Sequence, residues 1–320
     1  MKAVKVVKRI FIFIGSLLGV AIFILIMNYI RLTAHYFINP YNLKETYEVQ
    51  GNKKNYVPQG LAYSNKYNIA LQTSYNSKHN VSMVYITDLK KNKVIKKLKL
   101  KELDNTDNVN HVGGIATDNE TVWIANDYEV NEYKLEDMLK TKKDYIQSIK
   151  NTHLTIRGDF CFYKDNTLWI GDFFLKPFYK VPNDTPLVMS YNTEKEIDYN
   201  TPEAIISLPK MVQGMVITED NKFIFTHSFT NLIHCKMTLF DYVLEEKTDT
   251  YSLNGKEIPY YHFTEGNKLN SIDLPPMAEG FYQKGKKLYI LFENSSDTYW
   301  FALPKMNKVM SMNIKKIDRN

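Results

Sequence analysis

The sequence is poor in the residues that build metal, disulfide and phosphate sites. It has two cysteines, Cys161 and Cys235, and no CxxC or Cys/His cluster, which argues against a structural zinc site. It has no GxSxG, HExxH or glycine-rich phosphate-binding motif, so hydrolase, zinc-protease and nucleotide-binding functions lack their usual signatures. We expect both cysteines to be small buried strand residues, although a disulfide is permitted outside the cell.

Acidic residues are missing from the first 40 residues, which carry five Lys and Arg side chains. Since the chain has 41 basic residues in all, the rest holds 36 basic against 35 acidic residues. The net charge of +6 therefore belongs almost entirely to the N-terminal segment. A nearly neutral folded part argues against nucleic-acid binding.

Charge of either sign is absent from residues 10–30, a run of 21 residues that reads IFIFIGSLLGVAIFILIMNYI. At about 1.5 Å per residue, a helix of this length spans a hydrocarbon core of about 30 Å. The run is long and its exit is bulky, which favours an uncleaved signal anchor over a cleaved signal peptide. The positive-inside rule then predicts a cytoplasmic basic tail (1–9), a transmembrane anchor (10–30), a linker (31–55) and a folded domain outside the cell membrane (56–320).

Glycine (13) and proline (11) are few, whereas tyrosine (23) and phenylalanine (17) are plentiful, which suits β-strands. One hairpin pattern occurs five times: a polar or glycine turn, a short apolar strand, a polar turn and a second apolar strand. The residues in front of the first strand of each copy are Gln59, Gly113, Asp159, Gln213 and Glu279. The steps between them are 54, 46, 54 and 66 residues. A period near 50 with strands throughout predicts a β-propeller.

The predicted fold is all-β, a five-bladed β-propeller preceded by one N-terminal transmembrane helix. A third strand and a charged outer strand follow most hairpins, which gives about four strands per blade. A sixth blade built from residues 41–50 and 300–317 is the alternative, and joining both chain ends in one blade would remove exposed edges. We also expect a short helix or turn within 135–149 and a binding loop within 252–276.

Polar side chains that precede the inner strands should converge on the central channel of the ring. These channel candidates are Gln59, His111, Asp159, Gln213 and Glu279. Carboxylate and amide oxygens suit a divalent cation such as calcium. Glu279 and Asp159 could also act as general acid or base, with His111 as a partner. The alternative is structural: these groups only close the axis through hydrogen bonds to backbone across the channel.

A second set of polar residues ends the second strands of the five hairpins. Its members are Ser74, Asn126, Asp172, His227 and Glu293. We expect this set on the opposite face of the ring, one hairpin away from the first. A lone histidine such as His227 is more typical of a structural role than of a ligand.

Short motifs resemble known propeller families over residues 56 to about 300. The first repeat resembles the first blade of glutamine cyclotransferase-like five-bladed propellers, through Val57–Leu61, Thr73–Tyr75 and Val84–Asp88. The fourth and fifth repeats resemble secreted or membrane-anchored bacterial propellers, through Gln213–Met215, Pro275–Gly280 and Leu291–Glu293. The wider group includes gluconolactonase-like propellers, and the resemblance to them implies a calcium ion in the channel.

The chain departs from the gluconolactonase-like pattern at its first repeat. Those enzymes have a Glu-Gly pair early in the chain, whereas this sequence has Gln59-Gly60 there and Glu-Gly only at Glu279-Gly280. The departure counts against a calcium-dependent lactonase. The likeness to the cyclotransferases transfers no catalytic residue.

Three functions fit these observations. The first is a membrane-anchored, extracytoplasmic binding module for a small molecule or protein, with a polar channel site. The second is an extracytoplasmic enzyme, cyclotransferase- or lactonase-like, that uses channel carboxylates. The third is a ring that only binds a protein partner, which predicts a large apolar patch on one rim.

The predicted orientation is testable with protease added to intact cells. We expect the segment 41–320 to be digested while a cytoplasmic control protein stays intact, because the positive-inside rule places the folded domain outside. Protection of 41–320 would overturn this orientation.

Overall fold

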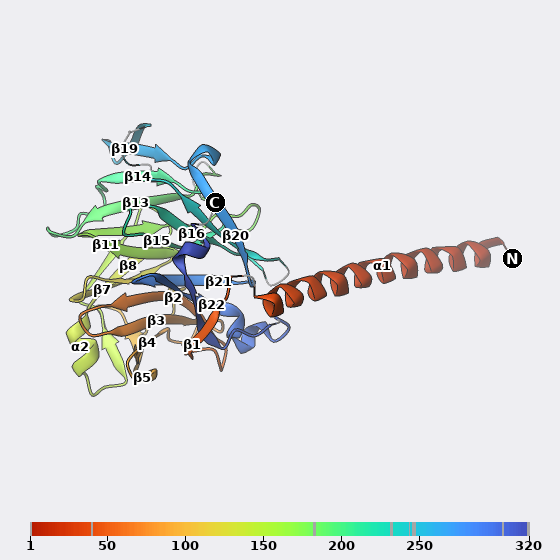
Figure 1. The fold of residues 1–320 in the computed structure, drawn as a ribbon, viewed down its shortest axis with the longest axis horizontal. Coiled ribbons are helices and arrows are strands. Elements are labelled where there is room, and N and C mark those ends of the chain that lie inside the picture. Colours follow the sequence, from red (N-terminus) through yellow and green to blue (C-terminus); the bar gives the residue numbers. More distant parts are fainter. Residues whose placement is uncertain are drawn as a thin grey trace.

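The chain forms a five-bladed β-propeller with a long apolar helix at its N-terminus (Figure 1). The computed structural model describes residues 2–39, 41–181, 184–230, 233–242, 244, 248–302 and 304–318. Helix α1 is Lys2–Ile38, and the short helix α2 is Leu135–Lys140. The prediction of an all-β ring of five hairpin repeats is confirmed.

Each blade is one antiparallel sheet whose first strand lies at the axis of the ring. Blade 1 has β2 (Tyr56–Ser64), β3 (Ile69–Asn76), β4 (Met83–Asp88) and β5 (Lys93–Lys101), and blade 2 has β6 (Gly114–Thr117), β7 (Thr121–Asn126), β8 (Glu129–Lys134) and β10 (Lys150–His153). Blade 3 has β11 (Phe160–Lys164), β12 (Thr167–Gly171), β13 (Leu187–Asn192) and β14 (Ala204–Ser207). Blade 4 has β15 (Val212–Ile217), β16 (Phe223–His227), β17 (Cys235–Phe240) and β20 (Lys268–Leu274). The inner strands β2, β6, β11, β15 and β21 contact one another in this order, and β21 contacts β2.

The fifth blade joins the two ends of the chain. Strand β1 (Lys44–Glu48) pairs with β23 (Lys308–Asn313), beside β22 (Lys287–Phe292) and the inner strand β21 (Ala278–Lys284). The predicted contributions of residues 41–50 and 300–317 therefore complete blade five, and the six-blade alternative is wrong. Because β1 falls within 31–55, that segment is only partly a linker.

Two neighbouring segments cover outer blade edges. Strand β9 (Tyr145–Gln147) follows α2 and adds to β5 of blade 1 in parallel. The hairpin β18 (Asp249–Leu253) and β19 (Lys256–His262) adds to β14 of blade 3. The predicted helix within 135–149 is thus limited to α2. The predicted loop 252–276 instead holds strands and a turn of helix, because its alternating side chains complete sheets on both sides.

The inner strands approach one another backbone to backbone at a level occupied by glycine in four blades. A Cβ built on Gly60 would lie 2.8 Å from the nitrogen of Ile115, and one on Gly280 would lie 2.5 Å from the nitrogen of Leu61. Gly114 is equally tight, at 2.3 Å from the nitrogen of Cys161. Only about 10 Å³ of space remains at this level. We call it the glycine ring, and it closes the channel.

Blade 3 has Phe160 where the other inner strands have glycine. Its ring lies against the neighbouring strand, where a Cβ on Gly171 would be 2.1 Å from Phe160 Cζ. The absence of a side chain at Gly171, on the second strand, therefore leaves room for the Phe160 ring from the first strand.

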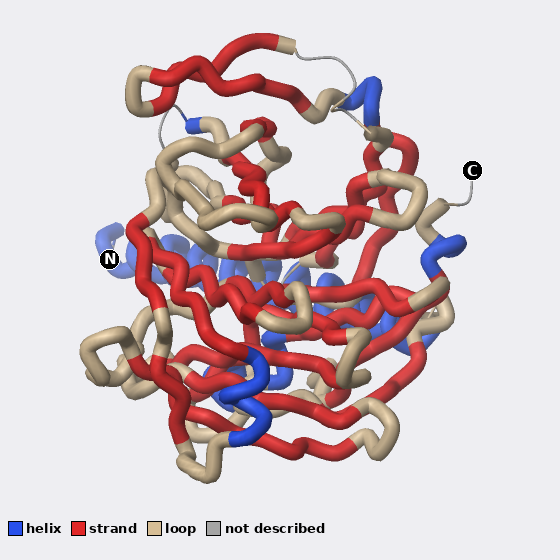
Figure 2. Tube along the Cα trace, turned by 90° about the vertical axis from the view of Figure 1, so that its left-hand side faces the viewer, coloured by secondary structure: helices blue, strands red, loops and turns tan. Residues whose placement is uncertain are grey.

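The glycine ring separates two ends of the propeller. The α1 face is the end at which the inner strands begin, and α1 extends from it (Figure 1). The distal face is the end at which the inner strands turn into the second strands. Figure 2 looks onto the distal face, with α1 behind the body.

Helix α1 contains a stretch, Lys5–Ala34, that is long and apolar enough to cross a membrane, and the most apolar 18-residue window within it has no buried residue. A helix of this kind serves as a membrane anchor or as a signal sequence. It continues without a break to Ile38, and Leu32 is buried between the exposed Arg31 and the half-buried Thr33. The helix therefore ends close to β1.

The sheets pack through apolar side chains that were recognisable in the sequence. Trp123 and Trp169 occupy equivalent positions on second strands and are buried, as expected. Both cysteines are buried and unbonded. The predicted core role of the cysteines is thus confirmed.

Ring closure by β1 can be tested through Tyr47, which is buried among residues of β2, β21 and β23 and hydrogen-bonds Tyr282 Oη at 3.2 Å. Tyr47→Ala should lower the free energy of unfolding by about 3–5 kcal/mol, because an aromatic ring is lost from the core. Urea unfolding of the full chain in detergent measures this. Tyr47→Phe is the matched control and should cost about 1 kcal/mol, since only a hydroxyl is removed. Equal losses in both variants would show that β1 does not stabilise the ring.

Candidate functional site

Three inner strands are irregular at the same place, just before or at the glycine ring. The pairing register shifts between Pro58 and Leu61, between Val212 and Gly214, and between Ala278 and Phe281. β-Bulges re-aim side chains and are common beside functional sites. Here they lie at Gln59, Gln213 and Glu279. Gln59 and Glu279 are buried, and Gln213 is half-buried.

Two glutamates meet at the start of the channel. Glu279 on β21 and Glu293, just after β22, are hydrogen-bonded carboxyl to carboxyl. The Nε2 of Gln59 donates to Glu293 Oε2 at 3.1 Å, and the hydroxyl of Tyr299 donates to the same oxygen at 3.1 Å. We call these four residues the axial cluster. Glu279 Oε1 is buried without a hydrogen-bond partner.

Burial raises the pKa of both glutamates because the charged form loses its hydration. The pKa of Glu279 is raised well above its usual range, first by burial and then by Glu293. The pKa of Glu293 is raised to about 7 by burial, partly offset by its hydrogen bonds from Tyr299 and Gln59. The pair therefore holds at least one shared proton at neutral pH, as carboxyl pairs do.

A second charged group lies beside the axial cluster. Asp159 Oδ1 is 3.0 Å from Arg157 Nε, and its Oδ2 accepts from the backbone N–H of Phe173 at 2.8 Å. Arg157 also reaches Asp127 Oδ1 at 3.3 Å and lies 5.4 Å from the ring centroid of Tyr179. Burial raises the pKa of Asp159 to about 6, against the lowering effect of Arg157. Asp159 thus has its own cation and is not the proton partner of Glu279.

His111 lies next to Tyr75, with 4.3 Å between ring centroids. Burial lowers the pKa of His111 to about 4, with a further lowering from Arg157. Its Nδ1 is buried without a hydrogen-bond partner. His111 is therefore neutral at physiological pH and packs against the Tyr75 ring at a tilt of 47°.

The second predicted set lies on the α1 face as well, so the expectation of an opposite face is wrong. In an antiparallel hairpin the end of the second strand lies beside the start of the first. Pro58 accordingly pairs with Ser74, and Phe160 pairs with Gly171 next to Asp172. Glu293 from this set joins the axial cluster directly.

The other members of the second set have structural partners or stand apart. Asp172 accepts from the backbone N–H of Leu187 at 2.6 Å, and Ser74 accepts from Gln72 at 3.3 Å. His227 bonds Lys210 and Thr238 and lines a separate cavity of about 350 Å³ on blade 4. Asn126 is buried, and neither atom of its amide has a hydrogen-bond partner.

Sequence reasoning missed Arg157, Tyr75, Tyr299 and the distal pocket described below. Arg157 carried a signal, because it is the single arginine between residues 32 and 318 in a lysine-rich chain. Arginine is preferred over lysine for buried carboxylate recognition. Tyr299 carried none, since it follows the last hairpin repeat and reaches the axis only through the fold.

Calcium in the channel, implied by the family resemblance, does not fit the residues found there. The axial cluster brings two carboxyl groups that bond each other and one amide, whereas calcium takes six to eight oxygens. Within the described ranges of the chain, no group of three or more His, Cys, Asp or Glu side chains could hold a metal ion. A protonated Glu279 needs no cation.

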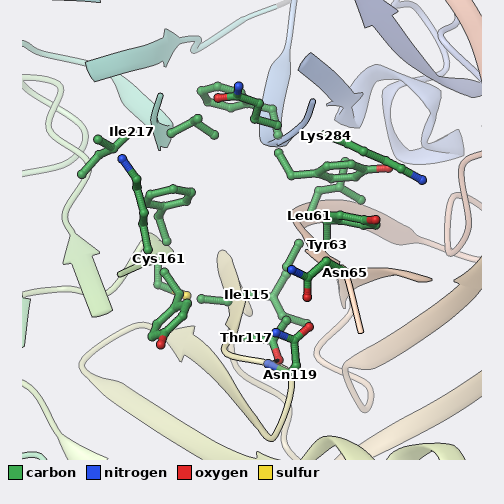
Figure 3. Close-up of a pocket in the computed structure, with 18 of the residues that line it drawn as sticks. Leu61, Tyr63, Asn65, Ile115, Thr117, Asn119, Cys161, Ile217 and Lys284 are labelled. Carbon is green, nitrogen blue, oxygen red and sulfur yellow. Dashed lines mark hydrogen bonds between the residues drawn. The ribbon is translucent and has the colours of Figure 1, made fainter. Parts of the chain in front are cut away.

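A pocket of about 510 Å³ opens at the distal face, on the other side of the glycine ring (Figure 3). All five inner strands contribute to it, with Leu61, Ile115, Cys161 and Ile217 along its walls. Hairpin turns supply a polar rim that includes Asn65 and Asn119. A pocket with apolar walls and a few convergent polar groups is typical of small-molecule sites.

Aromatic and cationic groups give the distal pocket its character. Tyr63 stacks on Tyr282 with 5.4 Å between centroids, and Lys284 Nζ lies 5.0 Å over Tyr63 while bonding Asn68. Cys161 is no nucleophile, because burial raises the pKa of its thiol to about 12. The pocket thus offers stacking surfaces and hydrogen-bonding groups.

No protein-family model and no curated protein sequence matches this chain. Solved structures with a similar arrangement include Myxococcus xanthus glutaminyl cyclase, at 8% identity and a TM-score of 0.46, covering 85% of this chain and 94% of that one. The PQQ-bound aldose sugar dehydrogenase of Streptomyces coelicolor has 12% identity and a TM-score of 0.45, covering 86% and 99%. A luciferin-regenerating enzyme has 10% identity and a TM-score of 0.44, covering 83% and 93%. Similarity at this level assigns no activity to the chain.

The carboxyl pair should make stability pH-dependent. A carboxyl group whose pKa is higher in the folded state than in the unfolded state stays protonated in the folded state over a pH range in which the unfolded state has lost the proton. The free energy of unfolding therefore falls as pH rises from about 4.5 through the folded-state pKa. His111 and His227, whose pKa values burial lowers to about 4, act in the opposite sense between pH 4 and 6.5. Comparison of variants therefore isolates the pair.

We expect Glu279→Gln to reduce the fall in unfolding free energy between pH 5 and 8 by about 1–3 kcal/mol, because an amide can donate to an ionised Glu293. Urea unfolding across this pH range measures the effect. The matched control is Glu257→Gln on exposed β19, which should follow the unmodified chain. A Glu279→Gln curve parallel to that of the unmodified chain would contradict a shared proton.

Proposed function

We propose that this protein is a membrane-anchored, extracytoplasmic β-propeller that binds a small organic molecule in its distal pocket. The observation that carries the proposal is a pocket of about 510 Å³ at the mouth of the channel that faces away from α1. With α1 in the membrane, this mouth opens toward the surrounding medium. A soluble ligand would then reach the pocket without passing the bilayer.

The chemistry of the two channel ends supports binding rather than catalysis. The acidic groups with raised pKa values, Glu279 and Glu293, lie on the α1 face. The glycine ring leaves only about 10 Å³ between them and the distal pocket. A ligand in the pocket would therefore not contact the carboxyl pair. Tyr63, Tyr282 and the rim amides would orient it by stacking and hydrogen bonding.

A second candidate is an enzyme that uses the axial cluster from the α1 face. It is favoured by the burial of Glu293 beside Glu279, which raises the pKa of Glu293 to about 7, a value that suits a general acid or base. Cyclisation of an N-terminal glutamine, in which the α-amine displaces ammonia from the side-chain amide, and lactone hydrolysis are the reactions to assay. Loss of turnover in Glu279→Gln with the fold intact would support this candidate over binding alone.

The binding proposal is tested by thermal shift of the full chain in detergent, against a panel of sugars, amino acids, nucleosides and small carboxylic acids. Ile217→Trp places an indole in the pocket wall. For any compound that raises the melting temperature of the unmodified chain, this variant should lower the binding affinity at least tenfold. Ile95→Trp makes the same change on the exposed outer strand of blade 1 and should leave affinity unchanged. Binding that survives Ile217→Trp, or a panel without effect, would count against the distal pocket.

A further inference from the structure

We propose that the α1 face of the propeller rests on the bilayer that holds α1, through a rim of exposed aromatic side chains. The inference rests on the proposed membrane anchoring of the chain and goes beyond ligand binding. It assigns a lipid surface as the partner of one face of the ring. The distal face, which carries the pocket, is then held away from the lipid.

The rim is built by three loops that follow second strands. Phe178 lies after β12, Phe229 and Ile233 lie after β16, and Trp300 and Phe301 lie after β22. Because second strands end where inner strands begin, all three loops emerge on the α1 face. These side chains are 36–80% exposed, with Trp300 the most open.

The exposed rings gather into groups across blades. Phe178 of blade 3 stacks on Phe229 of blade 4, with 5.8 Å between centroids, and Tyr179 meets Phe229 edge-on at 6.4 Å. Trp300 and Phe301 form another pair at 5.5 Å. Scattered apolar residues are normal on a surface, whereas clusters of large exposed rings mark interaction sites.

Helix α1 leaves the propeller on the same side as the rim (Figure 1). Its last two residues, Phe37 and Ile38, are 76% and 74% exposed. The uncharged run ends at Ile30 and the apolar stretch ends at Ala34, eight and four residues before Ile38, so the end of α1 lies about 6–12 Å along the helix axis from the hydrocarbon core. The headgroup region is about 5–8 Å deep on each side. Loops that protrude from the face can therefore enter the interface, where Trp and Tyr are enriched.

Exposed lysines near the rim suit an anionic membrane, whereas blade 1 brings the exposed Asp104 and Asp107 to the α1 face after β5. Lys53, Lys176, Lys180 and Lys210 are exposed in segments that begin or end on it. Of the acidic residues nearby, Asp184 pairs with Lys176, and Asp297 accepts from backbone N–H groups. Lysine side chains close to an anionic lipid surface are attracted to it.

Trp300 is a natural reporter of this contact. The other two tryptophans, Trp123 and Trp169, are buried in blades 2 and 3. The full chain would be reconstituted into vesicles of phosphatidylcholine and phosphatidylglycerol, with or without bromine near the top of the acyl chains. We expect brominated lipid to quench tryptophan emission in the unmodified chain and to leave emission unchanged in Trp300→Phe.

The matched control moves the reporter to the distal face. Tyr67 lies in the turn between β2 and β3 and is 38% exposed. The double variant Tyr67→Trp, Trp300→Phe should therefore show no quenching. Equal quenching of unmodified chain and Trp300→Phe, or none in either, would overturn the proposal, the latter pointing to a protein partner for the rim. Flotation of the same vesicles reports insertion separately, so chain that floats without quenching refutes the rim contact alone, and chain that fails to float refutes the anchor.

Discussion

The structure depends on one steric constraint, the approach of five backbones at the glycine ring. A Cβ at Gly60, Gly114 or Gly280 would overlap the neighbouring inner strand. Glycine at this level draws the blades to the axis and leaves no through-channel. The two ends of the channel are therefore separate environments. The end on the α1 face holds buried acidic groups, and the end on the distal face is open and lined by aromatic rings. Where blade 3 breaks the rule with Phe160, Gly171 restores the space.

Closure of the channel also determines the protonation of the carboxyl groups that lie beside it. Glu279 and Glu293 are held in a space too narrow for hydration, so proton sharing replaces charge separation. Arg157 serves the neighbouring Asp159 in the same space by direct ion pairing. Buried carboxyl groups near the axis are thus stabilised in two ways, by a shared proton and by an ion pair. Both give the buried carboxyl groups protein partners.

Local patterns predicted the blade count and the burial of Trp123, because these follow from strand period and alternation. Features that depend on pairing between distant segments were not predicted from the sequence. The hairpin β18–β19 binds blade 3 although it lies in the chain of blade 4, and Tyr299 reaches the axis from an irregular loop. The second polar set was expected on the opposite face of the ring. It lies on the α1 face because the second strand of each hairpin runs back toward the start of the first. The distal pocket depends on side chains from all five blades, which no single motif reveals.

The closing strand has a mechanical consequence. Since β1 begins six residues after α1 ends, any force applied through α1 passes through β1 before it reaches the rest of the ring. Strand β1 is held by pairing to β23 and by the buried ring of Tyr47. The strand that first takes up such a force is thus the one that holds the circle shut. A cut between Ile38 and Lys44 would release an intact ring, whereas a cut after Glu48 would leave the circle open.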